Sequence, residues 1–186
     1  MKKPLFIHIP KAGGTSIIEI IRKYNKDHPE GGHIKATTYP KEYRDSCFVF
    51  SFVRNPYDRL SSAHKYLTGG YGNKADVKFG KTLSLDFKYF VKHQLKNNMN
   101  WQHFLTMVYL LNDDIDFIGK VENFQQDFDI ICDKIGIPQQ QLPHINKSNH
   151  KSNHKHYTEY YDDETRQTVS EIYAEDIERF GYKFEQ

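Results

Sequence analysis

The sequence predicts a three-layer α/β domain in which a short parallel sheet has helices on both faces. Two successive segments carry this prediction, because each has the pattern of a buried strand, a turn and a helix. The first runs from an apolar stretch at 4–9 through the turn Gly13-Gly14 into the helical pattern IIEIIRKY. The second joins an aromatic and β-branched strand at 47–53 to a helix at about 56–67. Strand, turn and helix in this order are typical of α/β units.

The remaining elements follow from periodicity and turn residues. Further helices are expected at about 84–96, 101–111 and 124–135, and a further strand at 116–121. The glycine- and lysine-rich stretch 69–82 predicts a mobile surface loop, and the polar stretch 138–156 predicts a second loop. A last helix is expected to begin at Asp162 or Asp163 and to end at Gly181.

Length and composition suit one folded domain over residues 1–186. The formal net charge is only +2, from 26 basic and 24 acidic side chains, so charge does not indicate a nucleic-acid partner. Cys47 and Cys132 lie in apolar runs and are expected to be buried thiols rather than a disulfide or metal ligands. The apolar runs are too short for a signal peptide or a bilayer span. We therefore expect a cytoplasmic protein without a membrane partner.

The motif HIPKAGGTS has the composition of an anion-binding loop. An anion at the start of a helix meets unpaired N–H groups and the positive end of the helix dipole. Gly13 and Gly14 allow close approach of the backbone, Lys11 adds a positive charge, and Thr15 and Ser16 add hydroxyl donors. The loop therefore predicts a site for a phosphate or a mixed phosphate–sulfate anhydride. The alternative interpretation is that this glycine turn serves only packing.

This loop differs from a Walker-type P-loop. There the lysine follows the glycines, whereas here Lys11 precedes them. No apolar run is followed by an obvious strand-terminal aspartate for Mg²⁺. Both features argue against ATP hydrolysis, although a P-loop nucleotide kinase stays a rival hypothesis.

The motif SFVRNPYDRLSSAHKY predicts a second anion site. Arg54 ends the expected strand, and Asn55 is a favoured N-cap for the helix that follows. Arg59 and Ser62 are three residues apart on one helix face, where a guanidinium and a hydroxyl can bind a phosphate. In the alternative interpretation Arg59 pairs with a nearby acid and Ser62 fills a small gap. Two separate anion sites imply a ligand with two separated phosphates, such as a 3′,5′-bisphosphorylated nucleotide.

Together the two motifs resemble the 5′-phosphosulfate loop and the 3′-phosphate motif of sulfotransferases that use 3′-phosphoadenosine 5′-phosphosulfate (PAPS). The resemblance is to the carbohydrate-type branch, which includes bacterial members and the heparan/uronyl 2-O-sulfotransferases, and it continues through FIGKVENFQQDF, PHINKS and YAEDIERFGY. It implies a P-loop-like fold, transfer of a sulfuryl group from PAPS to a hydroxyl of a carbohydrate or another small acceptor, 3′,5′-ADP as the product, and no required metal. It also implies three sets of cofactor contacts: Lys11, Ala12, Gly13, Gly14, Thr15 and Ser16 at the 5′-phosphosulfate, Arg54 and Ser62 at the 3′-phosphate, and Asn146 and Ser148 from a further loop.

The reaction requires one group that stabilises the negative charge of the leaving group and another that removes the proton of the acceptor hydroxyl. Lys11 is placed to neutralise the leaving group, and the acceptor hydroxyl needs a general base, for which histidine has a suitable pKa. His33, in GGHIKATTY, resembles the Gly-His segment that carries the base in the 2-O-sulfotransferases, and we expect it to be the base. His103 is the second candidate; alternatively it orients the acceptor or lies half-buried beside Trp101.

Other polar residues have competing interpretations. His8 suits a role in the core or in support of the site, and Glu19 is either a carboxylate base or a solvated residue of the first helix. A nucleotide-binding module without catalysis is a further alternative. Neither the acceptor nor the oligomeric state follows from the sequence. Four histidines cluster without the spacing of a zinc site: His144, His150, His154 and His156.

Overall fold

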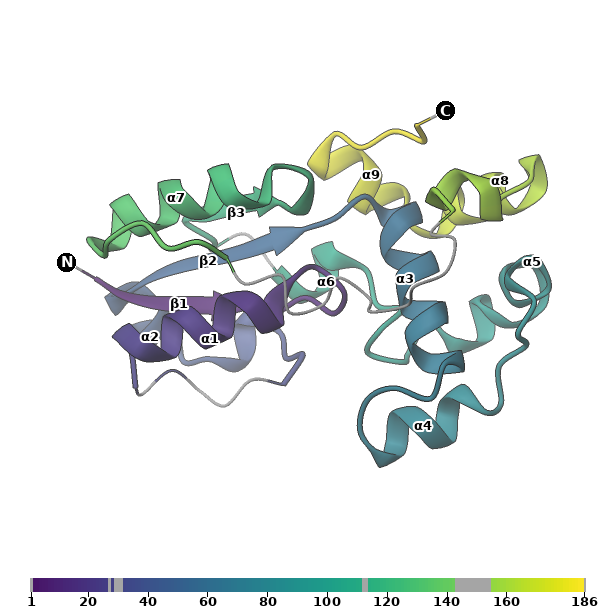
Figure 1. Cartoon of the computed structure of the whole chain (residues 1–186), viewed down its shortest axis with the longest axis horizontal. Helices are drawn as coiled ribbons and strands as arrows, with labels where there is room; N and C mark the ends of the chain where they lie inside the picture. The colour runs from purple at the N-terminus through teal and green to yellow at the C-terminus, as the bar shows by residue number, and fades with distance from the viewer. Residues whose placement is uncertain (1, 27, 29–31, 112–113, 143–154, 186) are drawn as a thin grey trace. The chain divides into compact units, whose positions relative to one another are not determined.

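The computed structural model describes residues 2–26, 28, 32–111, 114–142 and 155–185 (Figure 1). Its contacts separate the chain into two compact units. The first unit consists of Met1–Arg54 and Met107–Lys151, and the second of Asn55–Thr106 and Ser152–Gln186.

The first unit is built on a parallel sheet of three strands in the order β1-β2-β3. The strands are β1 (Lys3–Ile7), β2 (Cys47–Val53) and β3 (Phe117–Lys120). β1 and β2 are in parallel register, with Ile7 opposite Ser51, so their carboxyl ends lie side by side. The expected α/β class and parallel sheet are confirmed.

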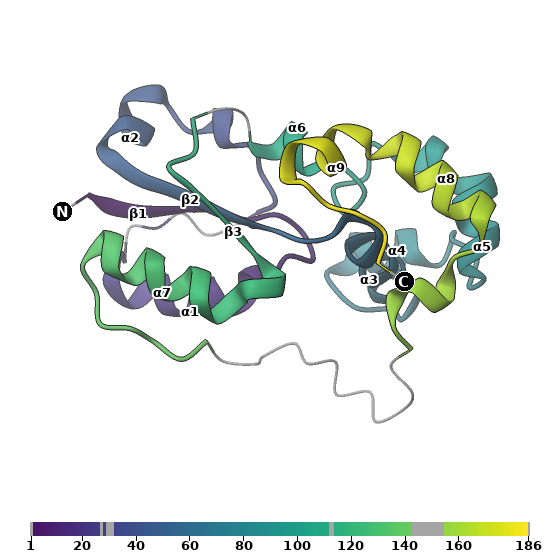
Figure 2. The same ribbon diagram turned by 90° about the horizontal axis from the view of Figure 1, so that it is seen from above.

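Helices flank this sheet on both faces. Figure 2 shows α1 (Gly14–Tyr24) and α7 (Phe124–Ile135) together on one face, with α2 (Lys41–Ser46) and α6 (Met107–Leu111) on the other. The 3₁₀ helix η1 (Ala36–Thr38) packs against α6. The core under α1 and α7 is made of aromatic and aliphatic side chains from helices and strands: Phe6, Ile17, Ile20, Ile21, Phe50, Phe52, Phe128, Ile131, Cys132, Ile135 and Leu142.

The flanking helices follow from apolar spacing and end signals. Ile17, Ile20 and Ile21 form one stripe of α1 that is buried against the sheet. The α7 helix ends where expected, because Gly136 adopts a φ of 70° that an L side chain rarely takes. The expectation of buried thiols is confirmed for both cysteines.

Side chains from the segment after α1 cover the outer edge of β1. The Asn25 amide donates to the Pro4 carbonyl (3.0 Å), and the Phe6 N–H donates to Nε2 of His28 (3.1 Å). Because β1 is an edge strand, these backbone groups lack a strand partner on that side. Two side chains therefore satisfy them.

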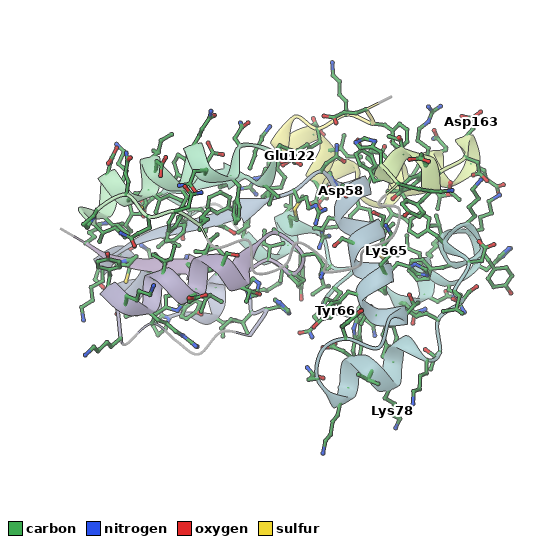
Figure 3. All side chains as sticks on the ribbon, in the orientation of Figure 1. Asp58, Lys65, Tyr66, Lys78, Glu122 and Asp163 are labelled. Carbon is green, nitrogen blue, oxygen red and sulfur yellow. The ribbon has the colours of Figure 1, made fainter. Side chains whose placement is uncertain are left out.

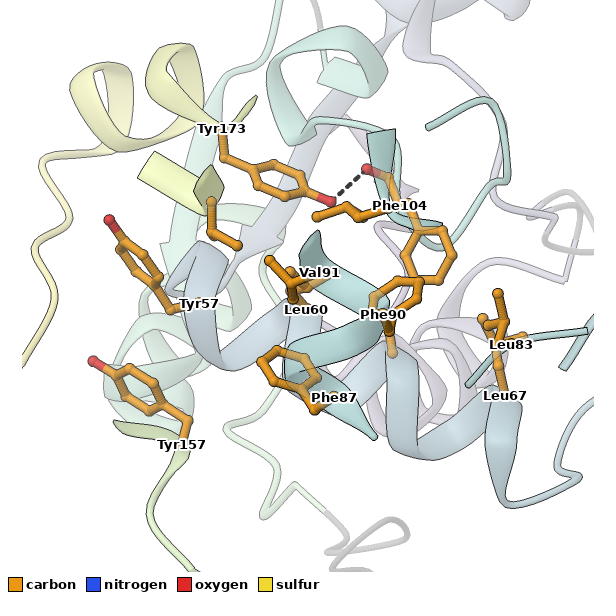
Figure 4. Close-up of a cluster of buried hydrophobic side chains, with 13 residues drawn as sticks. Tyr57, Leu60, Leu67, Leu83, Phe87, Phe90, Val91, Phe104, Tyr157 and Tyr173 are labelled. Atoms are coloured by element: carbon orange, nitrogen blue, oxygen red, sulfur yellow. Dashed lines mark hydrogen bonds between the residues drawn. The ribbon is translucent and has the colours of Figure 1, made fainter. Parts of the chain in front are cut away.

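The second unit is built around α3 (Pro56–Thr68), which begins where expected. The Asn55 side chain accepts from the Tyr57 N–H, so Asn55 is the N-cap. Figure 4 shows the apolar cluster on this helix, in which the Tyr173 hydroxyl donates to the Phe104 carbonyl over 2.8 Å. The cluster consists of Tyr57, Leu60, Ala63, Leu67, Leu83, Phe87, Phe90, Val91, Leu95, Phe104, Tyr157, Val169 and Tyr173.

The prediction of a loop over residues 69–82 is wrong for the second half of that stretch. The helix α4 (Lys74–Gly80) occupies it and packs on α3. Asn73 accepts from the N–H groups of Ala75 and Asp76, while the Asp76 carboxylate accepts from the Asn73 N–H. This capping box, together with the burial of Asp76, fixes a helix in a stretch whose glycines and lysines suggested a loop.

The next helical stretches are more irregular than expected. Residues 87–98 pass from α5 (Phe87–Tyr89) through a π-helical turn, η2 (Phe90–Gln94), to a 3₁₀ turn, η3 (Lys96–Asn98). The helix expected over 101–111 is wrong before α6, because residues 101–106 form turns.

The C-terminal helix is divided. Asp162 caps α8 (Asp163–Ile172), the helix breaks at Tyr173, and α9 (Ala174–Phe180) ends at Gly181, whose φ is 65°. A 3₁₀ helix, η5 (Tyr157–Tyr160), precedes α8. Residues 138–142, 155 and 156 form neither helix nor strand, whereas the rest of the expected 138–156 loop lies outside the described residues.

Candidate functional site

The turn between β1 and α1 has an unusual backbone. Lys11 and Gly13 have positive φ angles of 66° and 76°, and the Ala12 N–H donates to the Ile9 carbonyl (3.3 Å). This conformation is disfavoured for a lysine, so the surrounding structure must hold it. Gly13 is the N-cap of α1, and a glycine brings no side-chain oxygen to the first N–H groups of the helix. The start of this 11-residue helix therefore has no side-chain cap, and Lys11 lies in the turn that leads into it.

Arg54 joins this turn from the neighbouring strand. It directly follows β2, and its guanidinium donates to the Lys11 carbonyl over 3.1 Å. The contact arises from the parallel pairing of β1 and β2, which brings their carboxyl ends together. Two cationic residues from the two predicted anion motifs therefore meet at one edge of the sheet.

The electrostatics of the turn favour a bound anion. Burial, and next the positive charge of Arg54, lower the pKa of Lys11 from 10.5 to about 8. Both causes act against the protonated ammonium. An anion near the Lys11 ammonium would offset both, because it would attract this charge and balance that of Arg54.

Gly13 and Gly14 are also required by packing. A Cβ on Gly13 would collide with the Phe124 ring, and a Cβ on Gly14 would collide with the His8 ring. Both glycines therefore fit the packing interpretation as well as the anion-binding one. The Phe124 and His8 rings thus pack directly against the backbone of the loop at these two glycines.

His33, the expected base, lies beside this loop. Its ring meets the His8 ring at a centroid distance of 4.4 Å and an angle of 65°. His8 follows β1 directly, and its other ring contact is with Phe6 at 5.8 Å. Both imidazoles are partly exposed. The first unit thus brings together Lys11, Arg54, His8 and His33.

The other residues of the loop differ in exposure. Thr15 is exposed, so its hydroxyl is accessible, whereas Ser16 is buried and its N–H donates to the Gly13 carbonyl (3.2 Å). The Ala12 side chain is buried and can offer a ligand only backbone groups. Glu19 is exposed on α1, as a solvated residue would be.

Arg59 has a structural role within the second unit. It is 1% exposed, and its guanidinium donates to the carbonyls of Leu105 (2.6 Å) and His103 (3.5 Å). The prediction that a structural Arg59 would pair with a nearby acid is therefore wrong, because its partners are these backbone carbonyls. Ser62 lies half-buried on α3, three residues after Arg59.

His103 is enclosed rather than half-buried. It is 2% exposed, its Nδ1 lies 3.6 Å from Oδ1 of Asp76, and its ring faces that of Tyr66 at 5.3 Å. Tyr66 lies on α3 beside Lys65 (Figure 3). Trp101 stacks on another ring, that of Phe79, at 4.0 Å.

Several expectations fall beyond the described residues. Asn146, Ser148, His144, His150 and His154 all lie there. Among the residues that are described, no group of three or more His, Cys, Asp or Glu side chains could hold a metal ion. In the same part of the chain, no helix has the length and apolar character required to cross a membrane.

The sequence reasoning missed two contacts of the loop. Phe124 was expected only as the start of a helix, although it lies just four residues after the end of β3. Its position near the carboxyl end of a third parallel strand was the available signal. His8 was given a supporting role without a partner, and the structure places its ring against Gly14, His33 and Phe6.

Comparison with models of protein families gives a match over nearly the whole chain. The model of a family described as the sulfotransferase family matches residues 2–183. A curated protein of Archaeoglobus fulgidus, named only as an uncharacterized protein, is 29% identical over 107 residues, which are 57% of this chain and 82% of that protein. No solved structure matches the chain.

Proposed function

The chain belongs to the sulfotransferase family, and from this premise we propose that it transfers the sulfuryl group of PAPS to a hydroxyl of a carbohydrate acceptor. The observation that carries the proposal is the hydrogen bond from Arg54 to the Lys11 carbonyl. It brings the two anion motifs of the sequence to one sheet edge. A nucleotide with phosphates at both its 3′ and 5′ positions suits such a pair of cations.

The residues of this edge suit an anionic nucleotide. The 5′-phosphosulfate would bind at the start of α1, held by backbone groups from Ala12 to Ser16, by the Thr15 hydroxyl and by Lys11. Arg54 would bind the 3′-phosphate, and the motif resemblance adds Ser62. Because the family match spans both compact units, we further propose that they act as one catalytic domain.

Catalysis then requires an exchange of bonds at sulfur, neutralisation of the leaving group and removal of the acceptor proton. A bond forms from the acceptor oxygen to sulfur while the bond from sulfur to the bridging phosphate oxygen breaks. The electron pair of that bond stays on the leaving 3′,5′-ADP, where the Lys11 ammonium neutralises it. The proton of the acceptor hydroxyl passes to a neutral imidazole, for which we propose His33.

We prefer His33 to His103 as the general base because the two imidazoles differ in exposure and in neighbours. The His33 ring is partly exposed and contacts His8, whose own ring lies against Gly14 at the start of α1. His103 is enclosed by its own unit, next to Asp76 and Tyr66. A base must reach the acceptor proton within hydrogen-bond distance, so a partly exposed imidazole is the better candidate.

Two measurements test the proposal. Calorimetry should show tighter binding of 3′,5′-ADP than of ATP with Mg²⁺; the reverse order would favour a P-loop kinase. Labelled PAPS should then transfer its sulfur to a member of a panel of neutral and anionic oligosaccharides. Tight 3′,5′-ADP binding without transfer to any acceptor would instead indicate a nucleotide-binding module without catalysis.

A further inference from the structure

The His8 ring packs against a helix start, a strand and a loop of the first unit. Its Nε2 and Cδ2 atoms lie nearest to the position that a Cβ on Gly14 would take, so this edge of the ring faces the first residue of α1. The Phe6 ring stacks on the imidazole at a centroid distance of 5.8 Å and an angle of 27°. The His33 ring contacts it edge to face at 4.4 Å. His8 therefore lies between the start of α1 and the proposed base.

Phe6 connects this arrangement to the core of the first unit. It lies two positions before His8, so the two side chains project toward the same face of the sheet. Phe6 is 2% exposed and contacts the Phe50 ring of β2 at 5.3 Å. His8 directly follows β1 and is itself partly exposed. The imidazole is thus fixed on one side to buried aromatic rings, while part of it stays accessible at the carboxyl edge of the sheet.

His33 lies in a stretch without regular secondary structure. Residues 32–35 form neither helix nor strand, so the hydrogen-bond pattern of a regular element does not fix the His33 ring. An edge-to-face pair is directional, because the positive edge of one ring faces the negative face of the other. The contact with His8 therefore restricts the angle at which the His33 imidazole presents its nitrogens.

A general base must be oriented as well as close to its substrate. It has to reach the acceptor proton within hydrogen-bond distance, and a misplacement of about 1 Å can lower a rate about 10²-fold. We infer that His8 is a positioning residue for the general base: its ring, packed between Phe6 and Gly14, sets the orientation of the His33 imidazole. The inference rests on the proposed function, since it takes His33 as the base.

Substitutions of His8 separate positioning from simple packing. His8→Ala removes the ring and should lower kcat for transfer from PAPS about 10–100-fold, while the affinity for 3′,5′-ADP stays within about twofold because Lys11 and Arg54 remain. His8→Phe keeps an aromatic ring without nitrogens and should retain kcat within about threefold. A loss in His8→Phe as large as that in His8→Ala would show that the nitrogens of His8 act chemically, and the positioning role would be wrong.

A double-mutant cycle tests whether His8 acts through His33. If it does, His8→Ala should change the residual turnover of a His33→Ala variant by less than about twofold, because the group to be oriented is already absent. An equal loss in both backgrounds would show that His8 acts independently of His33 and would overturn the inference. Should His8→Ala fail to fold, His8→Leu, which retains apolar bulk but no ring, replaces it in the cycle.

Tyr24→Ala is the matched control, since it also removes an aromatic ring. Tyr24 is exposed and ends α1, about 15 Å along the helix axis from Gly14, so the variant should keep full turnover. An equal loss of turnover in Tyr24→Ala, or a loss of 3′,5′-ADP affinity in His8→Ala that matches its loss of turnover, would indicate a general distortion and overturn the positioning role.

The failure of the inference is distinguishable from that of the proposed function. An unaltered protein that transfers no sulfuryl group from PAPS contradicts the proposed function itself. If transfer occurs and His33→Ala keeps near-normal turnover, His33 is not the base and the inference falls with that assignment. If His33→Ala loses turnover while His8→Ala keeps it, the positioning role alone is wrong.

Discussion

The imidazole of His33 meets that of His8 edge to face, with ring centroids 4.4 Å apart. The His8 ring also lies against the backbone of Gly14, where there is no space for a Cβ. His8 therefore connects the proposed base to the first residue of α1. This edge-to-face contact relates the orientation of the His33 ring to the turn before α1.

His33→Ala should separate binding from chemistry. The variant is expected to bind 3′,5′-ADP normally, because the cations Lys11 and Arg54 remain, but to lose about 10²–10⁴-fold in turnover of PAPS. Calorimetry and a labelled-PAPS assay measure the two effects. His93→Ala, at an exposed position of η2, is the matched control and should keep full turnover. Near-normal turnover of His33→Ala would move the base elsewhere.

The affinity for 3′,5′-ADP should fall as the pH rises through about 8. Burial and the charge of Arg54 lower the pKa of Lys11 to about 8, so the ammonium is present below this pH and is lost above it. Titration calorimetry between about pH 7 and 9.5 would show the decline. Lys11→Arg should remove it, because a guanidinium stays charged throughout this range. An unchanged decline in Lys11→Arg would assign the titration to another group.

Gly14→Ala should destabilise the fold by about 1–3 kcal/mol, because the added methyl collides with the His8 ring. Removing that ring as well, in Gly14→Ala with His8→Ala, should recover part of the loss. Urea unfolding of the single and double variants measures this coupling. Gly32→Ala is the control, since among the described residues its Cβ would meet Ile34 at an ordinary 3.5 Å. Strictly additive effects would contradict the contact.

Arg59→Lys tests whether this arginine supports the fold or binds phosphate. An ammonium cannot reproduce the fork that donates to the carbonyls of Leu105 and His103, so stability should fall by about 1.5–3 kcal/mol. Affinity for 3′,5′-ADP should stay within about twofold once the variant is folded. A weaker affinity at unchanged stability would restore the phosphate interpretation.

Local signals predicted the elements that carry the candidate site. Asn55 and Gly136 marked the start of α3 and the end of α7, because capping depends on the backbone geometry of a few neighbouring residues. Arg54 was expected at the end of one strand and Lys11 in the loop after another, and parallel pairing of β1 and β2 brings the two residues together. That part of the site needed only strand order and the rule that parallel strands share a carboxyl edge.

Contacts between segments far apart in the sequence could not be predicted. The α4 helix has a buried Asp76, which composition alone does not show, and Tyr173, at the break between α8 and α9, donates its hydroxyl to the distant Phe104 carbonyl. The enclosure of His103 has the same origin, since Asp76 comes from α4 and Tyr66 from α3. Such contacts depend on how helices pack, and spacing along one helix carries no information about that.

The two side chains that bond to the outer edge of β1 also affect whether another strand can join the sheet there. Asn25 and His28 bond with Pro4 and Phe6, the positions at which a fourth strand would pair. A foreign strand would first have to displace both side chains, so the sheet is protected from growth along this border. Within the described residues, the β1 edge of the sheet is thereby closed to a further strand by two side chains that follow α1.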